Sequence, residues 1–134
     1  MTQKSPFAPA TGANRKMKVL LTGAQKTGKT EALLSWPRVA LVDSEDGAAY
    51  HVDRVAPFVS TFTQEVDTLL NLISTVRADA GASFDTLGID SITVFRDVVV
   101  ARGMRAAGAK FGIRERGVFN ARLAGVWHAL MNLP

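Results

Sequence analysis

The chain contains no cysteine, which excludes disulfide bonds and thiolate metal sites. It contains only two histidines, His51 and His128, and neither has a partner at metal-ligand spacing, so both are predicted to be structural. No apolar run approaches the roughly 20 residues of a membrane-spanning helix, and the N-terminus lacks the apolar segment of a secretory signal. These absences predict a cytoplasmic protein without a membrane partner.

Aromatic residues are also few, at 7% of the chain. The two tryptophans, Trp36 and Trp127, sit among apolar residues at helical spacing. This spacing predicts that both tryptophans pack in the core and do not serve as platforms on which nucleic-acid bases stack.

Positive charge is distributed unevenly along the chain. The 134 residues carry a net charge of +4, and 47% of them are hydrophobic, which is enough for one domain with a packed core. Between residues 96 and 122, seven basic residues stand against two acidic ones, so this stretch alone carries +5. Such a stretch can bind a polyanion, but on charge alone a solvated helix surface is the favoured interpretation.

One motif carries the strongest chemical signal. Residues 23–30 fit the pattern G-x-x-x-x-G-K-[ST] of the phosphate-binding P-loop. The glycines of such a loop let the backbone turn tightly, so that successive N–H groups point at the phosphates of a nucleotide. The predicted nucleotide-binding residues are Gly23, Ala24, Gln25, Lys26, Thr27, Gly28, Lys29 and Thr30.

The context of the motif favours this interpretation over a chance match. Residues 17–22 are predicted to form a short buried strand that enters the loop, and residues 29–36 a helix that Pro37 stops. The helix would add its positive N-terminal end to the site. Lys29 is predicted to be catalytic and to reach the β- and γ-phosphates of ATP, and the Thr30 hydroxyl to bind Mg²⁺.

Strands and helices alternate along the rest of the chain. Further strands are predicted at 39–42, around 58–60 and at 86–90, and a helix with an apolar stripe lies before the last of them. A helix is expected after Ser91 and another at 118–132, with a loop at 106–117 between them. This alternation predicts an α/β fold with a mainly parallel sheet.

Acidic residues follow two of the predicted strands, at the sheet edge where open parallel sheets bind ligands. The strands near 17–22, 39–43 and 86–90 are expected to lie parallel, with Glu45 and Asp90 on neighbouring strand ends. Asp90 ends the strand at 86–90 and fits the Walker B acid that holds Mg²⁺ or its water. Hydrolysis also needs a base for the attacking water. Ser91, which follows Asp90, cannot be that base, so Glu45 is predicted to be catalytic, with Asp43 and Asp46 as weaker alternatives.

With these residues identified, the chain resembles the RecA-type P-loop ATPases. It is most similar to the short phage and prophage nucleotide-binding proteins of the AAA/RecA type that take part in recombination and single-strand annealing. The resemblance rests on residues 41–45 and 89–93 and extends over about 17–134. It implies a three-layer fold, a bacterial host cytoplasm and ATP hydrolysis with Glu45 as the base and Asp90 in the Walker B strand.

The chain also departs from the pattern of these proteins. Gly88 lies in a Walker B strand that is usually bulky and apolar, and the sequence stops where the pattern would continue into a sensor strand. That strand would lie between those at 17–22 and 86–90, so we expect a gap or an abnormal direct pairing there. On this interpretation residues 1–16 are a flexible lead-in and residues 17–134 are a core that is incomplete at its C-terminus.

The same resemblance implies a DNA-binding loop after the Walker B helix, at residues 106–117. Lys110, Arg114 and Arg116 could neutralise phosphates there, and Phe111 could stack on a base. Single-stranded DNA is therefore a predicted partner, and a solvated connector is the alternative.

The sequence leaves three functions open. The first is a DNA-acting ATPase of the RecA type, for which the resemblance also implies self-association because such sites are often completed between subunits. The second is a P-loop kinase of a small molecule, with the basic stretch as its lid. The third is a module that binds nucleotide and DNA with little hydrolysis. A GTPase is disfavoured because the chain has no Asn-Lys-x-Asp motif.

Overall fold

The computed structural model describes residues 16–108 and 112–133. Within them, three parallel strands form a sheet in the order β2-β1-β3, which confirms the predicted α/β fold. The strands are β1 (Val39–Asp43), β2 (Val59–Phe62) and β3 (Thr86–Asp90). In the register of the sheet, Asp43 pairs with Phe62 on one side and with Asp90 on the other. All three carboxyl ends therefore meet at one edge of the sheet.

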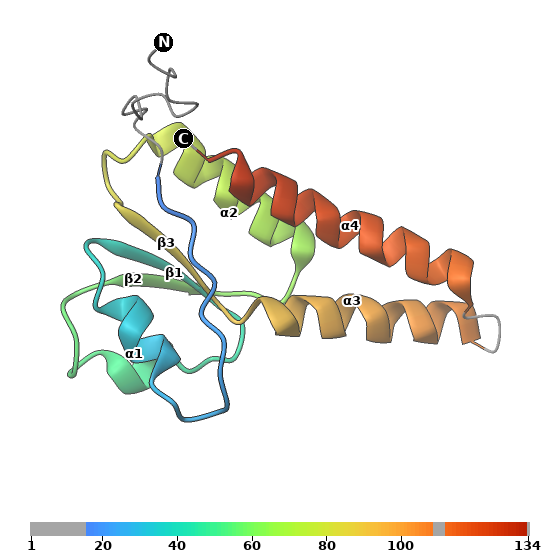
Figure 1. The fold of residues 1–134 in the computed structure, drawn as a ribbon, viewed down its shortest axis with the longest axis horizontal. Coiled ribbons are helices and arrows are strands. Elements are labelled where there is room, and N and C mark those ends of the chain that lie inside the picture. Colours follow the sequence, from blue (N-terminus) through green and yellow to red (C-terminus); the bar gives the residue numbers. More distant parts are fainter. Residues whose placement is uncertain (1–15, 109–111, 134) are drawn as a thin grey trace, which may run out of the picture.

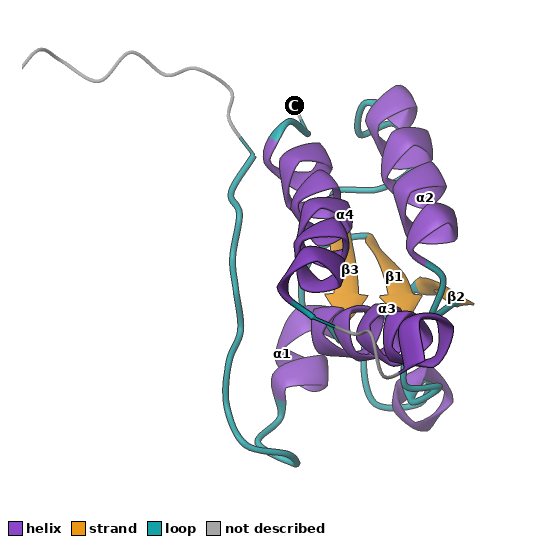
Figure 2. Cartoon of the chain, turned by 90° about the vertical axis from the view of Figure 1, so that its right-hand side faces the viewer, coloured by secondary structure: helices purple, strands orange, loops and turns teal. Residues whose placement is uncertain are grey.

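Helices lie on both faces of this sheet (Figure 1). One face carries α1 (Lys29–Leu34) and the short 3₁₀ helix η1 (Ala48–His51), and the other carries α2 (Val66–Asp79), α3 (Ile92–Ala107) and α4 (Ile113–Met131). Helices α3 and α4 run antiparallel, and α4 returns alongside α2 (Figures 1 and 2). The ends of α3 and α4 that are joined to each other lie away from the sheet.

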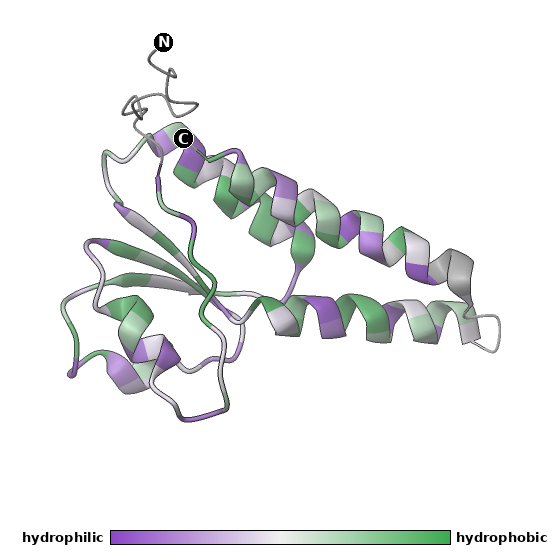
Figure 3. Cartoon of the chain, viewed as in Figure 1, coloured by the Kyte–Doolittle hydropathy of each residue, from purple (hydrophilic) through white to green (hydrophobic). Residues whose placement is uncertain are grey.

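Alternation of side chains along β1 divides the core into two clusters. Val42 faces α2, α3 and α4, whereas Val39 and Leu41 face α1 and η1. The first cluster also contains Val66, Leu69, Ile73, Phe95, Val99 and Val126. The second contains Leu34 and Ala48, with Trp36 packed against it as predicted. The central strand β1 is apolar up to its final aspartate because both of its faces are covered (Figure 3), whereas every residue of the edge strand β2 is exposed.

Gly88 determines how closely α1 approaches the sheet. It is buried in β3, and a Cβ atom built on it would lie only 2.8 Å from Leu33 Cδ2. A larger residue at this position would therefore force the Leu33 side chain to shift. The glycine weakens the strand by propensity, but it allows α1 to pack directly on β3.

Residues 17–22 do not form the predicted strand. They run as a loop outside the helices and the sheet (Figure 2), and Met17 and Leu20 are 72% and 65% exposed. Lys18 Nζ donates to the Leu133 carbonyl at 2.9 Å. A strand needs a neighbouring backbone for its hydrogen bonds, and β3 is the outer strand of the described sheet, with no ladder to these residues. Residues 17–22 have the apolar composition of a buried strand, but no strand of the described sheet pairs with them.

Helix boundaries also differ from the prediction. α4 begins at Ile113, so much of the loop predicted at 106–117 is helical, and only residues 108–112 join α3 to α4. Packing of α4 against α2 and α3 overrides the low helix propensity of the glycine at position 117. Trp127, predicted to be core, is 47% exposed. The lead-in predicted for residues 1–16 lies, except for Lys16, outside the described part of the chain.

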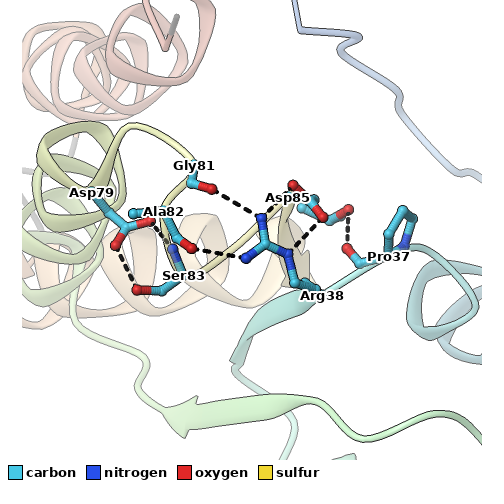
Figure 4. A network of polar contacts seen from close by, with 8 residues as sticks. Pro37, Arg38, Asp79, Gly81, Ala82, Ser83 and Asp85 are labelled. Carbon is cyan, nitrogen blue, oxygen red and sulfur yellow. Dashed lines mark hydrogen bonds and ion pairs between the residues drawn. The ribbon is translucent and has the colours of Figure 1, made fainter.

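A polar network fixes the edge of the sheet opposite the carboxyl ends (Figure 4). Arg38 forks onto the Asp85 carboxylate with two bonds of 2.8 Å and also donates to two carbonyls of the turn before β3. Asp79 accepts hydrogen bonds from the backbone and hydroxyl of Ser83. These bonds hold the pKa values of Asp85 and Asp79 below their ordinary range. The network therefore joins the start of β1 to the start of β3.

Candidate nucleotide-binding site

Residues 23–30 form the loop that enters α1. Gly28 is the N-cap of this helix and has a φ of 81°, which residues with a side chain rarely adopt. Lys29 Nζ folds back onto the loop and donates to the carbonyls of Gly23 at 3.0 Å and Ala24 at 2.6 Å. The positive charge of Lys29 therefore lies within the loop whose backbone would surround a phosphate.

Packing of α1 against β3 brings Thr30 and Asp90 together. Thr30 Oγ1 donates to Asp90 Oδ2 at 2.5 Å, although the two residues are 60 positions apart. Hydroxyl and carboxylate oxygens are among the ligands that Mg²⁺ takes in nucleotide sites. The chemistry of this pair therefore fits the predicted metal site.

Glu45 lies just beyond the end of β1, next to the end of β3. Its Oε1 accepts a hydrogen bond of 2.9 Å from Ser91 Oγ, and its side chain is exposed. Ser91 follows Asp90 directly, through a cis peptide bond. Glu45 and Asp90 thus lie on neighbouring strand ends, as the sequence predicted, and the exposed carboxylate of Glu45 can reach a water molecule.

Asp43, one of the alternative bases, has a different place. It is 5% exposed, and its two carboxylate oxygens accept hydrogen bonds from the backbone N–H groups of Glu45 at 3.0 Å and Ala48 at 2.7 Å. The carboxylate therefore holds the turn that follows β1 in shape. Because both carboxylate oxygens of Asp43 already accept hydrogen bonds, Glu45 is the better candidate for the base.

Two residues that the sequence analysis missed complete the strand ends. Ser44 is fully buried, and its Oγ accepts from Ser91 N at 2.8 Å and donates to Ser91 O at 2.9 Å. Gln64, just before α2, donates from Nε2 to the Ser44 carbonyl at 2.8 Å. A serine between two acids has no pattern that marks it, so only the pairing of β1 with β3 reveals its contacts.

Acids from outside the basic stretch neutralise part of its charge. Arg102 of α3 forks onto Glu65, with Nη1 2.5 Å from Oε2, and Arg122 of α4 donates to Asp67 at 2.6 Å. The hydrogen bonds between Arg102 and Glu65 lower the pKa of Glu65 and raise that of Arg102. Both arginines therefore tie α3 and α4 to the start of α2.

The four predicted DNA-binding residues lie at or near the α3–α4 connection. Lys110 and Phe111 are outside the described residues, whereas Arg114 and Arg116 fall at the start of α4. Arg116 N donates to the Gly112 carbonyl at 3.2 Å, as expected in a first helical turn. This end of the helix pair points away from the strand ends that carry Asp90 and Glu45 (Figure 1).

Across residues 16–108 and 112–133, no helix has both the length and the apolar character needed to cross a bilayer. A parallel sheet between two helical layers, with a glycine-bounded loop leading into α1 beside the strand ends, defines the class as an α/β P-loop nucleotide-binding fold. A protein-family model described as an AAA domain matches residues 15–132, and the chain belongs to this family of P-loop AAA-type NTPases. No curated protein and no solved structure matches it significantly.

Proposed function

We propose that the protein binds ATP with Mg²⁺ and hydrolyses it. The observation that carries this proposal is the 2.5 Å contact between Thr30 of the P-loop and Asp90 at the end of β3, with Glu45 bonded to the adjacent Ser91. The residues that we propose to bind phosphate, to hold the metal and to act as the base therefore lie at one edge of the sheet. Membership of the AAA domain family supports nucleotide binding and hydrolysis in general.

The proposed roles follow from the chemistry of the side chains. Lys29 and the backbone N–H groups of the loop would bind the phosphates, and Thr30 and Asp90 would hold Mg²⁺, which would neutralise phosphate charge. Glu45 accepts a proton from the attacking water, whose oxygen bonds to the γ-phosphorus. The bond from that phosphorus to the bridging oxygen breaks, and ADP and phosphate leave.

We further propose that this activity serves DNA recombination or single-strand annealing. The resemblance to RecA-like phage proteins supports this role, as do the basic residues Lys110, Arg114 and Arg116 near the α3–α4 connection. Self-association would complete the site, as the resemblance to RecA-type ATPases implies. A kinase is less well supported, because the lid it needs would draw on Arg102 and Arg122, which are paired with acids at the start of α2.

The first test is nucleotide binding by the parent and by Lys29→Ala. Loss of a charge-assisted contact to phosphate should weaken the Kd for ATP–Mg²⁺ by about tenfold or more. Lys18→Ala is the matched control, because Lys18 contacts the Leu133 carbonyl rather than the loop, and it should bind as the parent does. Equal affinities for Lys29→Ala and the parent would overturn the assignment.

The second test is ATP turnover with and without single-stranded DNA. Release of phosphate by the parent would support hydrolysis, and stimulation by DNA would support the proposed role on DNA. Binding of ATP without measurable turnover in either condition would leave a nucleotide-binding module and exclude the ATPase. Turnover that single-stranded DNA does not change would argue against the DNA role alone.

A further inference from the structure

We propose that Ser44 is a positioning residue for ATP hydrolysis, whose hydroxyl holds Glu45 in register with Asp90. This inference rests on the proposed function. Nothing in the sequence motifs assigns Ser44 a role, and the side chain would not touch the nucleotide. Its importance follows from the bonds that it makes between two strand ends.

Ser44 continues the pairing of β1 with β3 by one residue. Asp43 and Asp90 are the last paired residues, and beyond them Ser44 N donates to the Asp90 carbonyl at 2.8 Å. The backbone hydrogen bonds between β1 and β3 end there, and the next bonds between the two strand ends come from the Ser44 hydroxyl. The hydroxyl oxygen accepts from Ser91 N at 2.8 Å and donates to Ser91 O at 2.9 Å. One side chain therefore bonds to both backbone groups of the residue that follows Asp90, and the Ser91 carbonyl also accepts from Val94 N at 3.3 Å.

These bonds close a small ring that contains the proposed base. Ser44 is covalently joined to Glu45, Glu45 accepts from Ser91 Oγ at 2.9 Å, and Ser91 is bonded through its backbone to the Ser44 hydroxyl. Asp90, next to Ser91, is bonded to Thr30 of the P-loop at 2.5 Å. The ring thus connects the position of Glu45 to the proposed metal ligands.

The surroundings keep the Ser44 backbone from shifting. Gln64 donates to the Ser44 carbonyl at 2.8 Å, and the Asp43 carboxylate accepts from the N–H of Glu45 at 3.0 Å. Ser44 itself has no exposed surface, so water cannot replace its hydroxyl without movement of the strand ends. A displacement of a catalytic group by about 1 Å can lower the rate by about 100-fold. Loss of the hydroxyl should therefore reduce the rate of the chemical step.

The test compares Ser44→Ala, Ser44→Cys and Ser44→Thr with the parent in steady-state ATP hydrolysis. Ser44→Ala should lower kcat by about 100-fold, with KM and the Kd for ATP–Mg²⁺ within about twofold of the parent because the P-loop contacts are unchanged. Ser44→Cys keeps the side-chain size with a weak hydrogen-bonding thiol and should show the same loss, which provides the measurement if Ser44→Ala does not fold. Ser44→Thr keeps the hydroxyl and should recover kcat relative to Ser44→Ala.

Ser60→Ala is the matched control, because Ser60 is exposed on β2 in the same sheet. It should leave kcat, KM and the urea midpoint unchanged. A Ser44→Ala variant that loses nucleotide affinity and kcat in equal proportion would show a general structural role and overturn the positioning role. Parental kcat in both Ser44→Ala and Ser44→Cys would overturn the inference while the proposed hydrolysis stands.

A double-mutant cycle shows whether Ser44 acts through the base. The Ser44→Ala/Glu45→Gln variant should have the same kcat as Glu45→Gln alone, because the hydroxyl has no base left to position. Multiplication of the two losses would overturn the inference. A parent that binds ATP without hydrolysing it would instead overturn the proposed hydrolysis, and this inference with it.

Discussion

Thr30 and Asp90, 60 positions apart, share a hydrogen bond of 2.5 Å between a hydroxyl and a carboxylate. The bond joins the P-loop to the sheet, because Thr30 lies in the first turn of α1 and Asp90 ends β3. Gly88 lies two residues before Asp90, and its missing Cβ is what allows Leu33 of α1 to sit on β3. The geometry of the proposed metal site therefore depends on a packing contact in the core.

Gly88→Ala is expected to destabilise the protein. The added Cβ would meet Leu33 Cδ2 at 2.8 Å, and overpacking of this kind typically costs about 1–3 kcal/mol in the free energy of unfolding. Urea denaturation measures the loss. Gly125→Ala on α4 is the matched control, because no atom lies within 4 Å of a Cβ there, and it should stabilise the helix by up to about 1 kcal/mol. Equal stability of Gly88→Ala and the parent would contradict this account of the α1–β3 contact.

Glu45→Gln is expected to abolish turnover while nucleotide binding persists. The amide keeps the shape of the side chain and removes the base, so kcat should fall by about 100-fold or more. Phosphate release and a binding titration separate the two effects. Asp46→Asn, the same kind of change one residue on, should retain turnover. Normal hydrolysis by Glu45→Gln would mean that another group acts as the base.

The bond between Arg38 and Asp85 should make stability sensitive to acid. Hydrogen bonding to Arg38 lowers the pKa of Asp85 from its ordinary value of 3.8. The carboxylate therefore contributes stability above about pH 3.8, and this contribution is lost as the pH falls further, through the lowered pKa of the folded state. The difference in unfolding free energy between the parent and Asp85→Asn should be greatest above about pH 5 and shrink below the ordinary pKa.

Urea titrations of the parent and Asp85→Asn at several pH values measure this difference. Arg38→Lys is an informative companion, because lysine keeps the charge but cannot fork onto both oxygens of Asp85. It should lose part of the stability above the ordinary pKa of Asp85. A parent–variant difference that does not change with pH would show that Asp85 acts by shape rather than by charge.

Joint replacement of Lys110, Arg114 and Arg116 by alanine should weaken binding of single-stranded DNA. Fewer phosphates would be neutralised and fewer counterions released, so the dependence of affinity on salt should also flatten. Fluorescence anisotropy with a labelled oligonucleotide at several salt concentrations measures both quantities. ATP binding should survive, because these residues lie far along the chain from the P-loop. Unchanged affinity and salt slope would identify the α3–α4 connection as a simple connector.

The strand ends were predictable because parallel pairing follows from local pattern. Apolar runs that end in Asp43 and Asp90 are recognisable as strands, and parallel strands place their carboxyl ends at one edge. The sequence therefore predicted that Glu45 and Asp90 lie on neighbouring strand ends. The prediction of a strand at residues 17–22 was wrong. An apolar pattern indicates that a segment tends to be buried, but a strand also needs a neighbouring strand to pair with.

The sequence by itself determined the alternation of strands and helices, the phosphate-binding motif and the prediction of Asp90 and Glu45 as site residues, because each depends on residues that are close together in the chain. The tertiary structure decided the contacts between distant residues. Ser44 reaches Ser91 only because β1 pairs with β3 in one register. Arg102 and Arg122 meet acids at the start of α2 only because three helices pack on one face. Such contacts leave no local pattern, since their partners come together only when the sheet and the helices assemble.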